Sequence, residues 1–257
     1  MDRLYRVEVE GRFTRVVERR GEWNELTGDP FGLYQRGDAI DPNSMRILPP
    51  VVPSKIVAVG LNYRDHAKEM GKELPAEPLI FLKPSTAVIG TEESIVIPTG
   101  AGRVDHEAEL GIVIGRTARH VAAAKARDYV LGLTCVNDVT DRDLQRRDVQ
   151  YTRGKGFDTF APVGPAIAVG LEAASLDVSS FVNGVNRQSS NTRELIFPVE
   201  ELVEFVSGVM TLLPGDIIST GTPSGVGPLV PGDRVVVKVE GVGELANDVI
   251  ADREGQL

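Results

Sequence analysis

The chain has 257 residues, with 28 Lys or Arg and 37 Asp or Glu, so its formal net charge at pH 7 is −9. This acidic balance excludes nucleic acid or an anionic membrane as the main partner, because both need a basic surface. The single cysteine, Cys135, excludes an internal disulfide and is typical of a reducing, cytoplasmic compartment. We expect neither a secretory signal nor a membrane span, because the N-terminus is charged and no apolar run approaches ~18 residues.

The first 48 residues are predicted to form a small N-terminal β domain. Residues 4–9 alternate between apolar and polar side chains, Gly11 interrupts the alternation, and residues 13–17 resume it, which is the pattern of a β-hairpin. Residues 48–53 read Leu-Pro-Pro-Val-Val-Pro, and these prolines favour an extended linker. We therefore expect two domains, over residues 1–48 and 49–257.

A histidine and a glutamate share one face of the next predicted helix. Residues 55–60 are a candidate buried strand, and residues 62–70 change to a helical pattern that places His66 and Glu69 three positions apart. A carboxylate that hydrogen-bonds an imidazole fixes its tautomer and raises its basicity, as a general base requires. The alternative is an exposed helical ion pair without a chemical role. Residues 79–85 are predicted to be a further short strand.

Two carboxylates lie within the apolar run of residues 104–114, which is predicted to be one strand. Side chains alternate along a strand, so Glu107 and Glu109 point to the same face, about 7 Å apart at roughly 3.3 Å per residue. Two such anions repel each other unless a positive charge compensates them, and a bound cation is the simplest solution. The alternative is the solvent-exposed face of an edge strand.

A third carboxylate, Asp138, follows a second apolar run. A helix is predicted over residues 122–128 and a strand over 129–136, which places Asp138 at a strand end, where loops carry function. Three carboxylates without a cysteine pattern are typical of a hard, oxygen-ligated site for Mg²⁺, Mn²⁺ or Ca²⁺. Zinc is not predicted, because the chain has no thiolate pair and no His-x-x-x-His spacing.

Residues 138–150 are predicted to form a helix that faces this site. On such a helix Asp138, Arg142 and Gln145 share one face. An arginine donates two parallel hydrogen bonds to a carboxylate, and a glutamine donates to a carbonyl or holds a water. Arg142 as a surface charge is the alternative. Lys155 lies between two glycines, which either let the backbone approach a ligand or form the tip of a loop.

The C-terminal third is predicted to contain packing elements and one polar turn. The packing elements are a strand-rich region ending at an Asn183-Gly184 turn, an amphipathic helix over residues 198–212, two Pro-Gly-Asp turns before strands, at 214–216 and 231–233, and a late strand over 235–239. Residues 219–227 lack the lysine and spacing of a P-loop, so nucleotide binding is not predicted. Their N–H groups and hydroxyls suit a carboxylate.

In this order the segments resemble the fumarylacetoacetate hydrolase family, from about residue 50 to about residue 250. No single motif is decisive, but the ordered set is specific. The matching motifs are Gly60-Leu61-Asn62-Tyr63-x-x-His66, Phe81-Leu82-Lys83-Pro84-Ser85, Asp105-His106-Glu107-Ala108-Glu109-Leu110, Asn137-Asp138-Val139-Thr140-Asp141-Arg142-Asp143-Leu144-Gln145, Lys155-Gly156-Phe157-Asp158-Thr159 and Thr220-Gly221-Thr222-Pro223-x-Gly225.

The resemblance implies an α+β fold, a strand-rich mixed β roll that is usually assembled as a homodimer. It implies a Mg²⁺ or Mn²⁺ ion, with Ca²⁺ as an alternative, and metal ligands at Glu107, Glu109 and Asp138. It also implies substrate contacts from Arg142, Gln145, Lys155 and Thr222, and water activation by His66 and Glu69 as in short acylpyruvase-like members.

The chain departs from the family pattern in two places. The long eukaryotic hydrolase has a larger N-terminal domain that supplies a further acidic metal ligand, and residues 1–50 show no clear counterpart. Asp141 is more acidic than the small residue expected at its position. The second difference affects the expected substrate preference rather than the metal site.

The implied activity is that of a metal-dependent enzyme acting on a small 2-oxo acid. The carboxylate and keto oxygens of the substrate chelate the metal, which stabilises the enolate that forms when the C3–C4 bond breaks, and Lys155 adds positive charge. The leading hypothesis is hydrolytic cleavage of a 2,4-dioxo acid, as in acylpyruvases, or decarboxylation. The alternatives are 2-hydroxyhepta-2,4-diene-1,7-dioate isomerase or 5-oxopent-3-ene-1,2,5-tricarboxylate decarboxylase activity in aromatic catabolism, and a non-catalytic binding protein.

Overall fold

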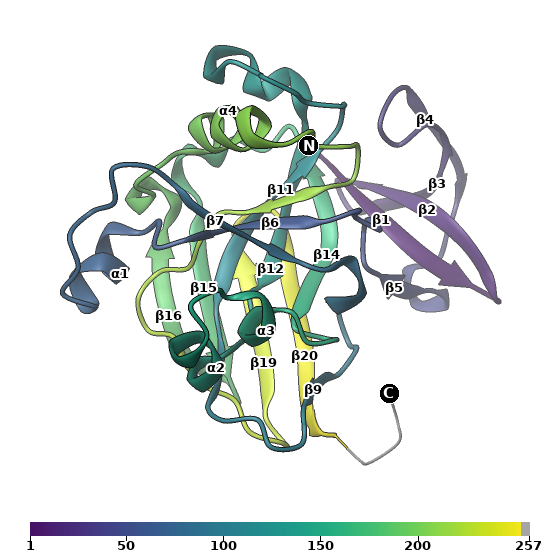
Figure 1. Cartoon of the computed structure of the whole chain (residues 1–257). Coiled ribbons are helices and arrows are strands. Elements are labelled where there is room, and N and C mark those ends of the chain that lie inside the picture. The colour runs from purple at the N-terminus through teal and green to yellow at the C-terminus, as the bar shows by residue number, and fades with distance from the viewer. Residues whose placement is uncertain (253–257) are drawn as a thin grey trace.

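The computed structural model describes residues 1–252, whose strands form a large sheet, a second sheet and a small sheet (Figure 1). The large sheet contains β1 (Asp2–Val9), β2 (Arg12–Arg19), β3 (Glu22–Gly28), β4 (Tyr34–Ala39), β5 (Arg46–Leu48), β6 (Ile56–Gly60), β7 (Leu79–Lys83), β8 (Val88–Ile89), β11 (Ala108–Ile114), β12 (Val130–Asn137), β14 (Ala161–Val169) and β17 (Ile217–Ser219). Its path is β4-β3-β2-β1-β14-β12-β11-β17-β6-β7, with β5 beside β1 and β8 beside β14.

The other two sheets hold the remaining strands. The second sheet runs in the order β16 (Val185–Asn191), β15 (Asp177–Val182), β19 (Arg234–Val239), β20 (Gly243–Ala251) and β9 (Ile95–Ile97). The small sheet runs β13 (Thr140–Asp141), β10 (Val104–His106) and β18 (Gly227–Pro228). The α-helices are short: α1 (Arg64–Glu69), α2 (Arg142–Arg147), α3 (Thr152–Lys155) and α4 (Val199–Val209). The prediction of a strand-rich, mixed α+β fold is confirmed.

The main hydrophobic core lies between the large sheet and the second sheet. Leu110 of β11 and Leu133 of β12 belong to one buried cluster with Val237 of β19 and Leu245 of β20. Each buried aliphatic side chain of this kind stabilises the fold by roughly 1.5–3 kcal/mol. The predicted apolar stripe of α4 joins the same core, with the exception of the exposed Val209. These packed strands give the polar site described below a rigid support.

The N-terminal strands extend the large sheet. β1 and β2 form the predicted hairpin, and β1 also pairs with β14 on its other side. Leu4 and Val17 are buried in one cluster with Val51 and Ile56. In Figure 1 these purple strands lie along one side of the molecule. The proposed boundary after residue 48 stays a prediction, and residues 253–257 of the proposed main domain lie outside the described residues.

The segment predicted as one strand over residues 104–114 is two strands in different sheets. β10 pairs with β13 and β18, whereas β11 pairs with β12 and β17. Glu107 lies between them, and its backbone N–H donates to the Asn137 side chain (3.0 Å). The prediction of one continuous strand is therefore wrong, because the chain changes sheets at Glu107. The edge-strand alternative is also wrong, because β11 is buried along its whole length.

The helix predicted over residues 138–150 is shorter than expected. α2 begins at Arg142, because the Asp141 carboxylate accepts hydrogen bonds from the N–H groups of Asp143 and Leu144 (both 3.0 Å) and caps the helix. Asp138 precedes β13 and is not on the helix. The prediction that Asp138 shares a helix face with Arg142 is therefore wrong, although both side chains reach the same cavity.

Lys155 is the last residue of α3 and is only 2% exposed, so the alternative of a loop-tip lysine is wrong. Gly154 allows α3 to approach α2 closely, because a Cβ there would lie 3.0 Å from the Asp141 carbonyl oxygen and 3.0 Å from the Gln145 backbone nitrogen. This glycine therefore serves the packing of two short helices.

Several other predicted elements are confirmed. The buried strand over residues 55–60, the strands over 79–85, 129–136 and 235–239, and both Pro-Gly-Asp turns are present. Asn183 and Gly184 form the predicted turn, with φ values of 52° and 77°. The helix predicted over 122–128 is a 3₁₀ helix, Ala123–Tyr129. Across residues 1–252, no helix has both the length and the apolar character needed to cross a bilayer.

Candidate active site

All nine side chains that the sequence analysis singled out line one cavity of about 660 Å³. They come from six parts of the chain: α1, the β10–β11 segment, the end of β12, α2, α3 and the turn after β17. The nine are His66, Glu69, Glu107, Glu109, Asp138, Arg142, Gln145, Lys155 and Thr222. Apolar residues complete the wall, among them Leu61, Met70, Leu79 and Phe81.

Three buried carboxylates meet in this cavity. Glu107, Glu109 and Asp138 each offer an oxygen atom, and these atoms lie within 4.8 Å of one another. The register of β11 and β12 explains the meeting, because Ala108 lies opposite Asn137 and so brings Asp138 next to Glu107. The Asp138 N–H donates to the Glu107 carbonyl oxygen (2.9 Å). Each of the three residues is at most 5% exposed.

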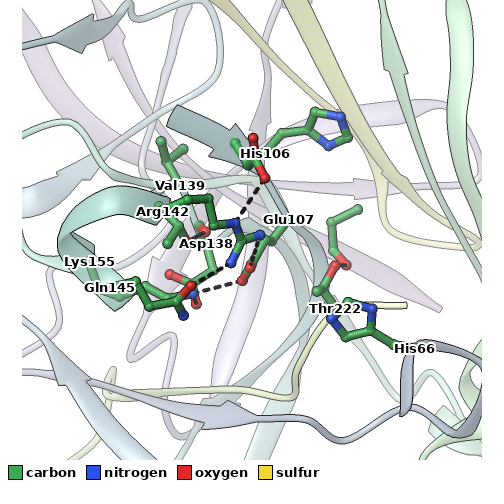
Figure 2. Close-up of polar contacts among 12 residues, drawn as sticks. His66, His106, Glu107, Asp138, Val139, Arg142, Gln145, Lys155 and Thr222 are labelled. Carbon is green, nitrogen blue, oxygen red and sulfur yellow. Dashed lines mark hydrogen bonds and ion pairs between the residues drawn. The ribbon is translucent and has the colours of Figure 1, made fainter. Parts of the chain in front are cut away.

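Lys155 and Arg142 surround this acidic cluster with positive charge (Figure 2). The Lys155 ammonium donates to Glu107 Oε2 (2.8 Å) and to Asp138 Oδ2 (2.5 Å). The Arg142 guanidinium lies 2.6 Å from Glu107 Oε1 and donates to the Asp105 carboxylate (2.9 Å). Arg142 also donates to Gln145 Oε1 (2.9 Å), which fixes the direction of that amide.

Lys83 is a further cation that the sequence analysis did not single out. It is fully buried at the end of β7 and donates to Asp138 Oδ1 and to the Val139 carbonyl oxygen (3.1 Å). A lysine that follows an apolar strand normally lies in solvent, so its burial was not expected. Its place in the Phe81–Ser85 motif was the available signal.

The cations compensate the carboxylates unequally. Burial alone would raise the pKa of Glu107, but the charges of Lys155 and Arg142 hold that pKa well below its usual range. Glu109 makes no ion pair among the described residues. Burial, followed by the charges of Asp138 and Glu107, raises the pKa of Glu109 to about 8. An additional cation would therefore stabilise the ionised form of Glu109 more than that of Glu107.

The predicted glycine-rich turn does hold a carboxylate, that of Glu109. Ser219 Oγ (2.5 Å) and the Gly221 N–H (2.9 Å) both donate to Glu109 Oε2. Gly221 has a φ of 93°, and a Cβ there would lie 2.9 Å from Asn62 Cβ, so only glycine fits the turn. The next residue, Thr222, is 6% exposed and donates through Oγ1 to the Ala108 carbonyl oxygen (2.9 Å).

His66 and Glu69 form the predicted pair on α1. His66 Nδ1 lies 3.0 Å from Glu69 Oε2, and Glu69 also accepts from the Gly225 N–H (3.2 Å). An ionised carboxylate only accepts hydrogen bonds, so Nδ1 would carry a proton, and in a neutral imidazole Nε2 then keeps the lone pair. In Figure 2 His66 lies on the opposite side of Glu107 from Gln145 and Lys155. The arrangement can accept a proton from a molecule held in the cavity.

The carboxylate cluster fits a hard divalent cation. The donor set is three carboxylate oxygens, which Mg²⁺, Mn²⁺ and Ca²⁺ all prefer. Lys83, Lys155 and Arg142 form ion pairs with Glu107 and Asp138, and the raised pKa of Glu109 reflects that its own charge has no such partner among the described residues. A cation bound among these oxygens supplies that compensation.

The fold and the site define a strand-rich protein of the α+β class, with a polar cavity built around three carboxylates. A family model described as fumarylacetoacetate hydrolase, C-terminal, matches residues 55–250. The chain belongs to the fumarylacetoacetate hydrolase family.

Relatives of known name share this fold over most of their length. A structure of 5-carboxymethyl-2-hydroxymuconate delta-isomerase from Mycobacterium smegmatis is 44% identical, covers 97% of this chain and 100% of its own, and has a TM-score of 0.91. The mitochondrial oxaloacetate tautomerase Fahd2a of Rattus norvegicus is 41% identical over 220 residues, which are 81% of this chain and 70% of that protein. Maleylpyruvate hydrolase from Sphingobium sp. SYK-6, in complex with manganese(II) and pyruvate, is 32% identical, covers 98% and 100% of the two chains, and has a TM-score of 0.80.

Proposed function

We propose that this enzyme acts on small 2-oxo acids with a divalent cation, Mg²⁺ or Mn²⁺, held by Glu107, Glu109 and Asp138. The observation that carries the proposal is the cluster of three buried carboxylates with cationic side chains around it. The related maleylpyruvate hydrolase was solved in complex with manganese(II) and pyruvate, which supports a divalent ion and a 2-oxo acid as ligands here. The proposed reaction is hydrolytic cleavage of a C–C bond in a 2,4-dioxo acid, with decarboxylation as a related outcome.

The balance of charge supports an anionic substrate. When ionised, the three carboxylates carry one negative charge each, and Lys83, Lys155 and Arg142 carry one positive charge each, so the two sets cancel. A divalent ion then leaves a local excess of positive charge. A 2-oxo acid brings one carboxylate and gains a second negative charge on its keto oxygen as the C3–C4 bond breaks and its electron pair is delocalised into the enolate. The site is therefore most complementary to the transition state.

The bound ion would act as a Lewis acid on the carboxylate and keto oxygens of the substrate. The side chains of the cavity orient that substrate and add to the electrostatic stabilisation. The Lys155 ammonium places positive charge beside Glu107 and Asp138, and this charge would stabilise a keto oxygen that becomes negative near these carboxylates. Gln145 accepts from Arg142 through Oε1, so its amide N–H groups point elsewhere and can donate to a substrate oxygen.

Hydrolysis also needs a base for water, and His66 fits that role. His66 Nε2 takes a proton from a water molecule as the water oxygen attacks the distal carbonyl carbon, and Glu69 stabilises the imidazolium through Nδ1. The electron pair of the broken C–C bond stays with the 2-oxo acid fragment, whose carbon then takes up a proton. The products are a carboxylic acid and a shorter 2-oxo acid.

Isomerisation or tautomerisation is the second candidate function, and the names of two relatives favour it. These reactions move a proton within a 2-oxo acid or its enol and break no C–C bond. They use the same carboxylates and cations but need no attacking water. The pairing of His66 with Glu69 prepares a proton acceptor at the cavity, which would activate water in the hydrolytic reaction and would move the proton in an isomerisation.

The direct test measures product formation from two substrates, with Mg²⁺ and with EDTA. Metal-dependent pyruvate release from acetylpyruvate supports the hydrolase, and release from oxaloacetate alone identifies a decarboxylase. Loss of the ultraviolet absorbance of enol-oxaloacetate without pyruvate release identifies a tautomerase. No turnover of any substrate by protein that still binds metal contradicts the proposal and favours a binding protein.

Three further expectations belong with this proposal. The partners are a small 2-oxo acid and a second copy of the chain in a homodimer, and no nucleic acid or membrane is expected. The single, fully buried Cys135 is consistent with a cytoplasmic location. The physiological reaction is expected to lie in aromatic catabolism if the isomerase or decarboxylase alternative holds.

A further inference from the structure

Gln188 has a fully buried side-chain amide that contacts two of the segments that build the candidate active site. It lies on β16 in the second sheet, and its relative exposure is 0%. Its side chain reaches the β10–β11 segment, which carries Glu107 and Glu109, and also the turn that carries Thr222. A buried amide must satisfy its own hydrogen-bonding groups, so these contacts fix its position strongly.

The orientation of the Gln188 amide follows from two partners whose roles are fixed. The Ala108 backbone N–H only donates, and it lies 2.9 Å from Gln188 Oε1. The Pro223 carbonyl oxygen only accepts, and it lies 2.9 Å from Gln188 Nε2. The amide oxygen therefore faces the strand and the amide nitrogen faces the turn. Ser180 Oγ (3.0 Å) donates to the same amide oxygen.

This orientation determines what the Thr222 hydroxyl can do. Gln188 Nε2 donates to Thr222 Oγ1 (2.8 Å), so that oxygen accepts, and the hydroxyl proton points to the Ala108 carbonyl oxygen (2.9 Å). Ala108 lies between two of the carboxylates, so Gln188 and Thr222 together connect the acidic cluster to the turn. The Thr222 side chain is thereby held in one rotamer at the cavity.

The turn that carries Thr222 and Gly225 also packs directly against β16. A Cβ at Gly225 would lie 2.2 Å from the Arg187 carbonyl oxygen, so the backbone of the turn is in close contact with the strand that carries Gln188. The Gly225 N–H in turn donates to Glu69 (3.2 Å). The β16 strand therefore supports Thr222 and, through the turn, the acidic partner of His66.

We infer that Gln188 is a positioning residue, which holds Thr222 at the distance from the carboxylate cluster that 2-oxo acid binding requires. This inference rests on the proposed function, because it takes Thr222 as a substrate contact. Gln188 does not line the cavity and makes no hydrogen bond to its carboxylates, so it acts through the hydroxyl and backbone of its neighbours.

The test substitutes Gln188→Glu, which keeps an oxygen for the Ala108 N–H and removes the donors to Thr222 and Pro223. Oxalate is the probe, because its two adjacent oxygen-bearing carbons mimic the carboxylate and keto groups of a 2-oxo acid. Oxalate affinity of the Mn²⁺-loaded protein should fall about tenfold, as expected for the loss of a buried hydrogen bond. Mn²⁺ affinity, measured separately, should stay within about twofold of the unsubstituted protein.

A double-mutant cycle separates positioning from general destabilisation. Thr222→Val removes the hydroxyl through which Gln188 acts, so Gln188→Glu should weaken oxalate binding by less than about twofold in that background. The same change at the exposed Gln35 on β4, Gln35→Glu, is the control and should leave oxalate affinity unaltered. If Gln188→Glu does not fold, Gln188→Asn, which keeps an amide but is one methylene shorter, should show the same selective loss.

Three outcomes overturn the inference. One is unchanged oxalate affinity in a folded Gln188 variant, and another is a loss that adds fully to that of Thr222→Val. A parallel loss of Mn²⁺ and oxalate affinity together with a lower melting temperature indicates a purely structural role. If the unsubstituted, Mn²⁺-loaded protein does not bind oxalate, the proposed function itself fails, and that result is distinguishable because no variant is needed to see it.

Discussion

At the residue scale, Glu109 is the least compensated of the three cavity carboxylates, and its titration should affect stability. Its folded-state pKa of about 8 lies above the ordinary 4.5, so the native protein retains a proton that the unfolded chain has released. The stability of metal-free protein should therefore fall as the pH rises from about 4.5 to about 8. A cation bound by the three carboxylates would replace the proton and should remove this loss.

The variant Glu109→Gln imitates the protonated side chain and should stabilise the metal-free protein. We expect no gain near pH 4 and a gain on the order of a few kcal/mol at about pH 8, measured by urea unfolding in EDTA. Glu201→Gln, at an exposed position of α4, is the matched control and should give no such gain. An identical unfolding free energy for Glu109→Gln and the unsubstituted protein at about pH 8 contradicts this account.

Lys83 should stabilise the metal-free site through its charge. Lys83→Met leaves Asp138 with one cation fewer, which should cost about 3 kcal/mol, as removal of one partner of a buried ion pair typically does. Mn²⁺ should restore part of this loss, because the ion then compensates Asp138, so the variant should show a larger rise in melting temperature on metal addition than the unsubstituted protein.

Lys55→Met is the control for this effect. It removes the partner of another fully buried carboxylate, Asp216, to which the Lys55 ammonium donates at 2.5 Å, but neither residue lines the cavity. Its destabilisation should not depend on Mn²⁺. Equal metal responses of the Lys83 and Lys55 variants contradict the proposed role of Lys83.

The acidic residues of the site could be predicted from the sequence, but their buried partners could not. Glu107 and Glu109 stand out because charges are rare within an apolar run, and Asp138 because it ends one. Lys83 also ends an apolar run and belongs to the Phe81–Ser85 motif, but a lysine at a strand end and a glutamine such as Gln188 within a strand are ordinarily surface residues, so neither was expected to be buried. Their burial depends on sheet neighbours far away in sequence, which local patterns do not describe.

At the scale of elements, α3 must pack closely on α2 to place Lys155. Gly154→Ala would put a Cβ 3.0 Å from two backbone atoms, the Asp141 oxygen and the Gln145 nitrogen, so α3 must move. We expect a loss of stability of about 1–3 kcal/mol and at least a tenfold lower kcat, because Lys155 moves away from its partners. Thermal unfolding and steady-state kinetics measure the two effects.

Gly208→Ala in α4 is the matched control for that substitution. Nothing lies within 4 Å of a Cβ at Gly208, so the change should stabilise the helix by up to about 1 kcal/mol and leave kcat unaltered. If Gly154→Ala also retains full kcat, close packing of α3 on α2 does not position Lys155.

Element boundaries near the site were the least predictable features. Periodicity predicted α4 and the buried strands well, because one apolar pattern covers each of them. It failed at Glu107, where an apolar segment changes sheets, and at Asp141, where a capping carboxylate starts a helix later than expected. Both failures occur where the chain departs from regular structure to bring polar groups into the cavity.

At the scale of the whole molecule, the N-terminal strands should unfold together with the rest of the chain. β1 pairs with β14 of the large sheet, and Leu4 and Val17 are buried in a cluster that includes Ile56 and Val163. Trp23, the single tryptophan, lies on β3 and packs on Tyr5 with ring centroids 4.7 Å apart, so its fluorescence reports this region.

Urea unfolding followed by Trp23 fluorescence should therefore coincide with unfolding followed by far-ultraviolet circular dichroism. The protein concentration must be the same in both experiments, because a homodimer would make the midpoint depend on it. A fluorescence transition at clearly lower urea than the circular dichroism transition shows instead that residues 1–48 unfold as an independent unit.

The central claim is that Glu107, Glu109 and Asp138 bind one divalent cation, and a titration of EDTA-treated protein with Mn²⁺, followed by electron paramagnetic resonance, tests it most directly. The account predicts one tightly bound ion per chain, with an affinity that increases between about pH 6 and about pH 8 as Glu109 loses its proton. Substitution of Glu107 or Asp138 by the corresponding amide should weaken binding at least tenfold. An absence of stoichiometric binding, or binding that survives these substitutions unchanged, contradicts it.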